Sequence, residues 1–268
     1  MTSQLKPLPA ATVTLVRDSD NGLEVLMLLR NFQSGFLPGM YMFPGGALDP
    51  DDYTHEAAAR CERLDDETAS GALGLADWIA ALRESFEEAG ILLARDARGR
   101  MVALDQPAVI ERFRVHRHAL NAGHCRFIPF VTSERLRLAV DQLLYFSHWI
   151  TPVGAPRRYD TRFFLAPAPA AQEPLHDNVE AIDHVWVQPA AALAAHGRGE
   201  FNMRTPTIKT LETFVRYGSV EELTAVLHAL REIPAMLPRI TKDGRRVLPG
   251  EPGYEEAANA EGQGRWEI

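Results

Sequence analysis

The chain has 268 residues, of which 46% are hydrophobic and 24% are charged, and its formal net charge is −8. This length and apolar content suffice for one well-packed core, and they favour a single elaborated domain over two. Broad nucleic-acid binding needs a basic face, so the acidic balance argues against a nucleic-acid partner.

Local composition disfavours further classes of protein. No run approaches the 18 apolar residues of a membrane span, and the N-terminus lacks the basic start and apolar core of a signal peptide. We therefore expect a soluble, cytoplasmic protein without a membrane partner. Cys61 and Cys125 lack metal-type spacing, so we expect ordinary thiols rather than a disulfide framework or a zinc site.

The first elements predicted along the chain are strands. Two β-rich runs, 11–17 and 24–30, flank the turn sequence 18–22, which predicts a hairpin. A short apolar strand from Met40 then leads into Gly45-Gly46, interpreted as a tight turn in which the backbone can approach a bulky anion. The acids that follow are typical of turns, and one of them, Asp52, is also a candidate metal ligand.

A helical region is predicted from about residue 54 to 93, with breaks near Gly71 and Gly74. Asp77 is a candidate N-cap for its last helix, and Gly90 is a natural C-terminal stop. At about 100° per residue, this last helix has one apolar face, formed by Ile79, Leu82, Phe86 and Ala89.

The opposite face of the same helix carries Glu84, Glu87 and Glu88. Each pair of like charges three or four residues apart costs a helix a few tenths of a kcal/mol, so the arrangement is unfavourable without a cation. Carboxylate oxygens are the ligands that Mg²⁺ takes. For these three acids alone, a solvated surface is the commoner alternative.

Later elements alternate between helix and strand. A helix is predicted from Pro107 to about Ala119, strands at 144–151, 158–166 and 182–187, a helix opening at Thr205-Pro206, and another with a Ser219-x-x-Glu222 capping box. This order predicts an α/β fold, in which a mixed sheet lies between helices. Residues 236–268 form a predicted C-terminal tail that is either wrapped around the domain or disordered.

Three histidines, at positions 116, 118 and 124, lie close together in sequence. Helical spacing places His116 and His118 on different faces, so no metal cluster is predicted there.

Gly46 and the segment Arg83-Glu84-x-x-Glu87-Glu88-x-Gly90-Ile91 resemble the signature of the Nudix hydrolases, which cleave nucleoside diphosphates linked to another moiety. Here 36 residues separate Gly46 from Arg83, whereas the signature has about 13, so about 23 residues are inserted. Asp52 stands in the place of the first Glu, and Ser85 replaces an aliphatic residue.

The insertion, about residues 53–75, is rich in Ala, Glu, Asp and Arg and is predicted to be helical and solvated. A helix inserted at this point resembles the branch of the mammalian peroxisomal coenzyme A diphosphatase and its bacterial relatives. Segments 30–46, 148–152 and 156–164 point to the same branch. The resemblance implies a Nudix α/β/α sandwich over residues 1–235, with a helical insertion inside the Nudix box and extra C-terminal helices.

The resemblance also implies roles for individual residues. Glu84, Glu87 and Glu88 would hold Mg²⁺ or Mn²⁺, and Arg83 would orient the catalytic carboxylate of Glu84. Glu180 is the candidate for a further catalytic acid, with Asp177 as competitor. The candidates for substrate binding are the Gly45-Gly46 backbone and the side chains of Arg30, Arg157 and Arg158. A plain surface charge is the alternative for each of these arginines.

The expected reaction is metal-dependent hydrolysis of a pyrophosphate bond in a small nucleotide-type substrate, with coenzyme A or acyl-coenzyme A favoured. Nucleotide sugars, ADP-ribose, dinucleoside polyphosphates and oxidised nucleotides remain alternatives. So do a non-catalytic Nudix-fold module that binds nucleotides and a purely structural scaffold. A homodimer is one option for assembly, by analogy with similar enzymes.

Overall fold

The computed structural model describes residues 5–35, 37–62 and 74–259. Its main sheet has eight strands in the order β10-β7-β8-β1-β2-β3, with β4 paired to β1 and β9 paired to β2. These strands are β1 Leu8–Ser19, β2 Gly22–Arg30, β3 Tyr41–Met42, β4 Gly45–Ala47, β7 Leu144–Ile150, β8 Tyr159–Pro167, β9 Ala181–Val187 and β10 Ala235–Met236. Short pairs β5 Ala94–Arg95 with β6 Arg137–Leu138, and β11 Arg239–Ile240 with β12 Arg246–Val247, lie apart from it.

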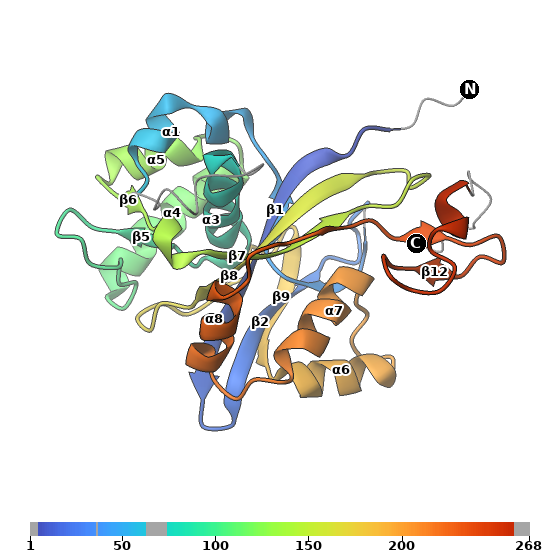
Figure 1. The fold of residues 1–268 in the computed structure, drawn as a ribbon. Helices are drawn as coiled ribbons and strands as arrows, with labels where there is room; N and C mark the ends of the chain where they lie inside the picture. The colour runs from blue at the N-terminus through green and yellow to red at the C-terminus, as the bar shows by residue number, and fades with distance from the viewer. Residues whose placement is uncertain (1–4, 36, 63–73, 260–268) are drawn as a thin grey trace.

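Helices cover both faces of the main sheet (Figure 1). One layer contains α1 His55–Ala59, α3 Leu75–Ala89, α4 Pro107–Asn121 and α5 Phe127–Ser133. The other contains α6 Pro189–Gly197, α7 Thr205–Phe214 and α8 Val220–His228. Single 3-10 turns occur at Pro50–Tyr53, Val140–Gln142 and Glu256–Asn259.

The strand directions confirm the predicted mixed sheet. β1 and β2 form an antiparallel hairpin that closes between Ser19 and Gly22, as the turn chemistry of 18–22 predicts. β1 also pairs with β8, and that pair is parallel. A hairpin can be closed by a short turn, whereas the parallel pair needs the long crossover that carries the helices.

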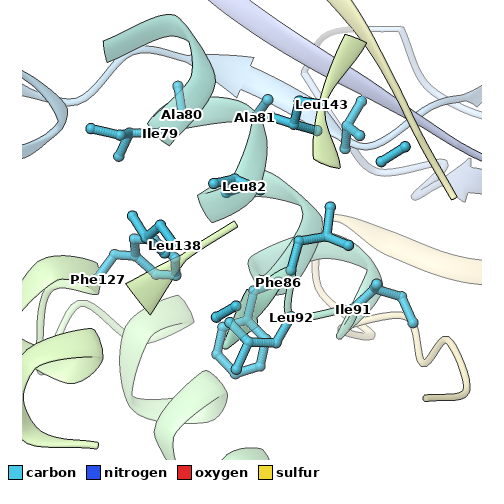
Figure 2. Packing of buried hydrophobic residues seen from close by; sticks show 14 of the residues in the cluster. Ile79, Ala80, Ala81, Leu82, Phe86, Ile91, Leu92, Phe127, Leu138 and Leu143 are labelled. Atoms are coloured by element: carbon cyan, nitrogen blue, oxygen red, sulfur yellow. The ribbon is translucent and has the colours of Figure 1, made fainter. Parts of the chain in front are cut away.

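The alternation of side chains along each strand explains why the sheet is covered on both faces. On β2, Leu26 and Leu28 point into one apolar cluster, while Val25 and Met27 point into the other. The first cluster packs against α3, α4 and α5, and Figure 2 shows members of it, including Leu82, Phe86 and Phe127. The second cluster packs against α6, α7 and α8. Burial on both faces therefore makes β2 an almost continuous apolar run.

The helix α3 begins one turn earlier than its predicted cap. Gly74 is the N-cap, and Asp77 lies three residues inside the helix, where its Oδ2 accepts the Gly74 N–H at 3.2 Å. The predicted role of Asp77 as N-cap is therefore wrong, although its carboxylate still satisfies a backbone donor at the helix start. Gly90 ends the helix in the left-handed region with φ 71°, as predicted.

The predicted helical insertion lies only partly within the described residues. The 3-10 turn at Pro50–Tyr53 is followed by α1, whose N-cap Thr54 accepts the Ala57 N–H at 3.2 Å. Helix α1 ends at Ala59, and Cys61 forms an isolated bridge with Leu138. Residues 63–73 of the insertion lie outside the described residues.

The segment beyond residue 235 contacts the domain. β10 extends the sheet by pairing in parallel with β7, Ala235 opposite His148 and Met236 opposite Trp149. Further along, Leu248 is buried in the second apolar cluster. Within the described ranges, no helix combines the length and the apolar character needed to cross a membrane.

Candidate functional site

The acidic residues of α3 face a pocket of about 410 Å³. Two walls of this pocket come from the 3-10 turn after β4 and from the loop before β9, and a third comes from the α4–α5 connection. The carboxylates that line it are Asp49, Asp51, Glu84, Glu87, Glu88, Asp177 and Glu180, whereas Arg83 and Arg126 are its arginines. The pocket therefore carries a strong excess of negative charge, which is suited to a cation.

The acidic face of α3 is not a solvated surface. Glu84 is 8% exposed and Glu88 is 5% exposed, as deeply buried as parts of the apolar core. The reason is that α3 packs against β4 and the 3-10 turn on its acidic side as well as against the sheet and α4 on its apolar side. Carboxylates are seldom buried unless they are paired or coordinate a metal, so this placement needs compensation.

Arg83 supplies part of that compensation. Its guanidinium forks onto Asp52, with Nε to Oδ1 at 3.2 Å and Nη2 to Oδ2 at 3.1 Å. The Nη1 group donates to Glu84 Oε1 at 2.7 Å and to Glu87 Oε2 at 2.9 Å. One arginine thus holds three carboxylates, and the planar five-donor fork makes this possible where a lysine could not.

Asp52 has a structural position in this network. Its carboxylate oxygens accept from Arg83, and Oδ2 also accepts the Asp49 N–H at 2.8 Å. Asp52 is 2% exposed and does not line the pocket. Asp52 therefore holds the Arg83 guanidinium in position and offers no oxygen to the pocket.

The sequence predicted a tight turn at Gly45-Gly46, and this prediction is wrong. Both glycines belong to β4, which pairs antiparallel with β1. They are needed for close approach rather than for a positive φ. A Cβ at Gly46 would lie 2.5 Å from Glu84 Oε1, and one at Gly45 would lie 2.7 Å from the Ala11 carbonyl oxygen. The backbone thereby reaches the acids, and the Gly45 N–H donates to Glu88 Oε2 at 2.9 Å.

The electrostatics of the acids reflect burial that Arg83 compensates only partly. Burial raises the pKa of Glu84 to about 7, opposed by Arg83 and reinforced by Glu87. The pKa of Glu88 is raised well above its ordinary value by burial and by the neighbouring Glu84 and Glu180. Burial also raises the pKa of Glu87. Burial by itself lowers the pKa of Arg83, but Glu84 and Asp52 raise it above the ordinary value.

The loop before β9 brings Asp177 and Glu180 to the pocket, and the structure gives them different surroundings. Asp177 Oδ1 accepts backbone N–H groups of the loop, among them that of Ala181 at 2.8 Å. Glu180 instead projects its carboxylate, which forms an ion pair with Arg30 Nη2. Arg30 also donates to Ser34 Oγ at 3.0 Å, so it reaches the site through Glu180 and does not itself line the pocket.

Side chains of helix α4 link the C-terminus of α3 to the loop before β9. No sequence motif predicts this contact. Arg117 Nε donates to the Glu87 carbonyl oxygen at 3.0 Å, and Nη1 donates to the Leu175 carbonyl oxygen at 2.6 Å. Asn121 Nδ2 donates to the same Glu87 oxygen at 3.0 Å. A cation at the C-terminus of α3 also complements the helix dipole.

Arg126 is a pocket residue that sequence reasoning did not find, because no local motif marks it. It stands just before α5, lines the pocket, and contacts Asp51 Oδ1 through Nη1 at 2.5 Å. Its side chain is 71% exposed, so most of the guanidinium faces solvent at the pocket rim.

The predicted substrate arginines 157 and 158 do not line the pocket. Arg158 is buried, and its guanidinium donates to the Thr151 carbonyl oxygen at 3.0 Å and to the Leu5 carbonyl oxygen at 2.7 Å. These hydrogen bonds link Leu5, in the segment before β1, to the connection between β7 and β8. Arg157 is exposed on that same turn.

Comparison with known proteins then decides the family. The family model described as the NUDT19 Nudix domain matches residues 62–213, more than half of the chain. The chain belongs to this family. The expected membership of the Nudix superfamily, in the coenzyme A diphosphatase branch, is thereby confirmed, and α3 with its acidic face lies inside the matched segment.

Individual relatives of this chain agree with the family assignment. It is 26% identical over 289 residues to the acyl-coenzyme A diphosphatase NUDT19 of Xenopus laevis, covering 92% of this chain and 75% of that protein. It is 27% identical over 283 residues to the human protein of the same name, covering 88% and 73%. The crystal structure of a NUDIX hydrolase from Alicyclobacillus acidocaldarius superposes with a TM-score of 0.67 at 28% identity, over 85% of this chain and 99% of that one.

Proposed function

We propose that this protein is a divalent-cation-dependent diphosphatase that hydrolyses the pyrophosphate of acyl-coenzyme A. The observation that carries the proposal is the set of three glutamates, Glu84, Glu87 and Glu88, gathered on one helix at a pocket. Burial raises the pKa of all three, which indicates negative charge that the chain itself does not neutralise. A cation bound there would relieve it.

The donor set fits a hard cation. Of the four α3 residues that line the pocket, three are glutamates and the fourth is Arg83, and carboxylate oxygens suit Mg²⁺ or Mn²⁺. In this proposal Glu84, Glu87 and Glu88 hold the ion, which when bound offsets the charge on the phosphoryl oxygens. Arg83 keeps Glu84 and Glu87 in place, and the Gly45 N–H keeps Glu88 in place.

Between the two candidates for the acid that orients the attacking water, the surroundings favour Glu180 over Asp177. The Asp177 carboxylate is occupied with backbone N–H groups of its own loop. Glu180 has a side chain that is 45% exposed at the pocket, and within the described residues its ion-pair partner is Arg30. A solvent-exposed carboxylate can accept the proton of water, and Arg30 would hold it toward the pocket.

The substrate assignment rests on the named relatives. The Xenopus laevis and human relatives, both acyl-coenzyme A diphosphatases, align with 92% and 88% of this chain, including the acidic helix. In this reaction water adds to a phosphorus of the pyrophosphate, and the products are an acyl-phosphopantetheine and adenosine 3′,5′-bisphosphate. Arg126 at the rim is the candidate for phosphate contact, because it lines the pocket and its side chain is 71% exposed.

The decisive experiment incubates purified protein and Mg²⁺ or Mn²⁺ with acyl-coenzyme A, coenzyme A, ADP-ribose, NADH and nucleotide sugars, and quantifies the products. We expect adenosine 3′,5′-bisphosphate from the coenzyme A compounds and none when EDTA removes the metal. Glu87→Gln should lower kcat/KM by about a hundredfold or more, because it removes charge at the metal. Glu212→Gln, on the exposed side of α7, is the matched control and should leave kcat/KM unchanged.

The outcomes separate the alternatives. Preferential cleavage of ADP-ribose or a nucleotide sugar would keep the diphosphatase and replace the substrate. Cleavage of no compound, with a nucleotide affinity that Glu87→Gln leaves unchanged, would indicate a non-catalytic binding module instead.

A further inference from the structure

A second cluster of potential metal ligands lies at the base of the loop that carries Asp177 and Glu180. His176 in this loop and Asp183 and His184 on β9 place one ligand atom each within 4.8 Å of one another. None of the three lines the acidic pocket. The sequence carries no signal for this cluster, because His176 lies beside His184 only after the loop has folded back on β9.

The separation of the two imidazoles suits a shared ion. His176 Nδ1 and His184 Nδ1 are 2.9 Å apart. With zinc–nitrogen bonds of about 2.0–2.1 Å, two imidazoles on one ion stand about 2.9 to 3.3 Å apart for bond angles between a right angle and the tetrahedral angle. The same nitrogen–nitrogen distance also allows one neutral imidazole to donate a hydrogen bond to the other. Experiment therefore has to distinguish this hydrogen bond from a shared metal ion.

The third ligand needs a small movement. Ligand atoms on one such ion lie at most about 4 Å apart, and the three candidate atoms already lie within 4.8 Å of one another, so a shift of less than about an ångström brings them together. Asp183 can supply this movement because it is exposed. Its Oδ1 accepts the backbone N–H of His184 at 2.8 Å. Its carboxylate lies within 4.8 Å of the imidazole nitrogens.

The donor chemistry differs from that of the acidic pocket. Two imidazole nitrogens and one carboxylate oxygen favour zinc, cobalt or nickel ions, whereas an all-carboxylate set suits magnesium.

We propose that His176, Asp183 and His184 bind a divalent transition-metal ion, zinc or a chemically similar ion, at a site separate from the acidic pocket. Three protein ligands leave a further position for water. The ion joins the loop to β9 immediately next to Asp177, which organises the backbone up to Glu180. Binding therefore stiffens the loop that forms one wall of the pocket.

The test uses full-length protein without a histidine tag, in excess Mg²⁺ so that the acidic pocket is occupied. Titration with Co²⁺, followed by its visible absorption, reports nitrogen ligation directly, and Zn²⁺ competition gives the zinc affinity. We expect one ion per chain and a rise in melting temperature on binding. His176→Ala and His184→Ala should abolish the absorption band, and Asp183→Asn should weaken binding by about tenfold.

Two variants serve as controls. His118→Ala removes an exposed histidine from α4 and should bind like the wild type. Asp183→Asn keeps an oxygen that can accept the His184 N–H, so it reads out ligation even where a histidine variant fails to fold. The proposal is overturned if Co²⁺ binds no tighter than millimolar, or if binding survives His184→Ala but is lost in Glu87→Gln, because the ion then occupies the acidic pocket.

Discussion

At the scale of single residues, Arg83 and Gly46 decide how the acids of α3 are held. Arg83 contacts Asp52, Glu84 and Glu87 with one guanidinium, so these three carboxylates cannot move independently. The Gly46 backbone lies so close to the Glu84 carboxylate that a Cβ there would be 2.5 Å from Oε1. The carboxylates are therefore positioned before any cation arrives, which lowers the ordering cost of binding one.

Glu84 makes stability depend on pH in a direction that can be measured. Its pKa rises from 4.5 to about 7 on folding, so the folded state favours the protonated form. The stability from neutral Glu84 is complete below pH 4.5 and is lost as the pH rises through about 7. We expect the melting temperature of metal-free protein to fall over this range relative to Glu84→Gln, whose amide does not titrate.

The measurement is thermal unfolding in EDTA at a series of pH values for both proteins. Added Mg²⁺ should stabilise the wild type more at pH 8 than at pH 5, because the ion competes with the proton for the acids. Parallel pH profiles for wild type and Glu84→Gln in EDTA would show that Glu84 does not titrate in this range.

Gly46→Ala tests the close approach of β4 to the acids. The new Cβ would meet Glu84 Oε1 at 2.5 Å, so the carboxylate has to leave its position on Arg83. We expect Mg²⁺ affinity, measured by calorimetry, to fall by about tenfold or more, with a lower melting temperature. The control is Gly197→Ala in α6, where no atom lies within 4 Å of the new Cβ. Unchanged affinity in Gly46→Ala would mean that β4 gives way instead.

At the scale of elements, α3 is fixed at its C-terminal end by groups from distant parts of the chain. Ser85 Oγ donates to the Ile91 carbonyl oxygen at 2.9 Å, and Gly90 reverses the chain. Beyond it, the buried Gln172 accepts the Leu92 N–H at 2.8 Å and donates to the carbonyl oxygens of Leu92 and Val102 at 2.9 and 2.8 Å. One side chain thus satisfies three buried backbone groups.

Gln172→Leu should therefore lower the free energy of unfolding by about 3 kcal/mol, because it leaves the Leu92 N–H and the Val102 carbonyl oxygen without this partner in the core. The Leu92 carbonyl oxygen still accepts the Ala94 N–H at 3.0 Å. Chemical denaturation gives the value directly. Gln106→Leu is the matched substitution at an exposed position, where the side chain makes no cap hydrogen bond, and it should change stability by less than about 0.5 kcal/mol. An equal effect of the two substitutions would contradict this account of the α3 terminus.

At the scale of the whole molecule, the sheet separates the site from a second apolar layer. The pocket belongs to the side of α3, whereas α6, α7, α8 and Leu248 pack on the other side. β10 completes the sheet beside β7. The predicted domain boundary at residue 235 therefore coincides with a strand that belongs to the main sheet.

Removal of residues 235–268 tests the contribution of this C-terminal segment. The truncation exposes the β7 edge and withdraws Met236 and Leu248 from the second cluster, so we expect a clearly lower melting temperature. Mg²⁺ affinity at low temperature should change little, because the pocket lies across the sheet. A shorter truncation after Asn259 retains all the contacts described above and is the reference for this comparison. If both truncations melt like the full chain, the boundary at 235 stands as a domain end.

Sequence alone determined the features that are encoded within one element or one turn. The β-rich runs became β1, β2, β7, β8 and β9, and the spacing of Glu84, Glu87 and Glu88 set them on one side of α3. Gly90 was recognisable as the helix stop because only its own backbone conformation is involved. The order of strands and helices was enough for the α/β class.

Only the tertiary structure decided which distant groups meet. Arg83 reaches Asp52 across 31 positions, and Arg30 reaches Glu180 across 150. The buried Arg158 donates to the backbone carbonyl oxygens of Thr151 and Leu5. For the acidic face the sequence left a solvated surface as an alternative, and the packing of β4 and the 3-10 turn buries it instead. The His176–His184 pair had no sequence signal at all. Such contacts depend on how loops close and which faces pack, and local periodicity carries no information about either.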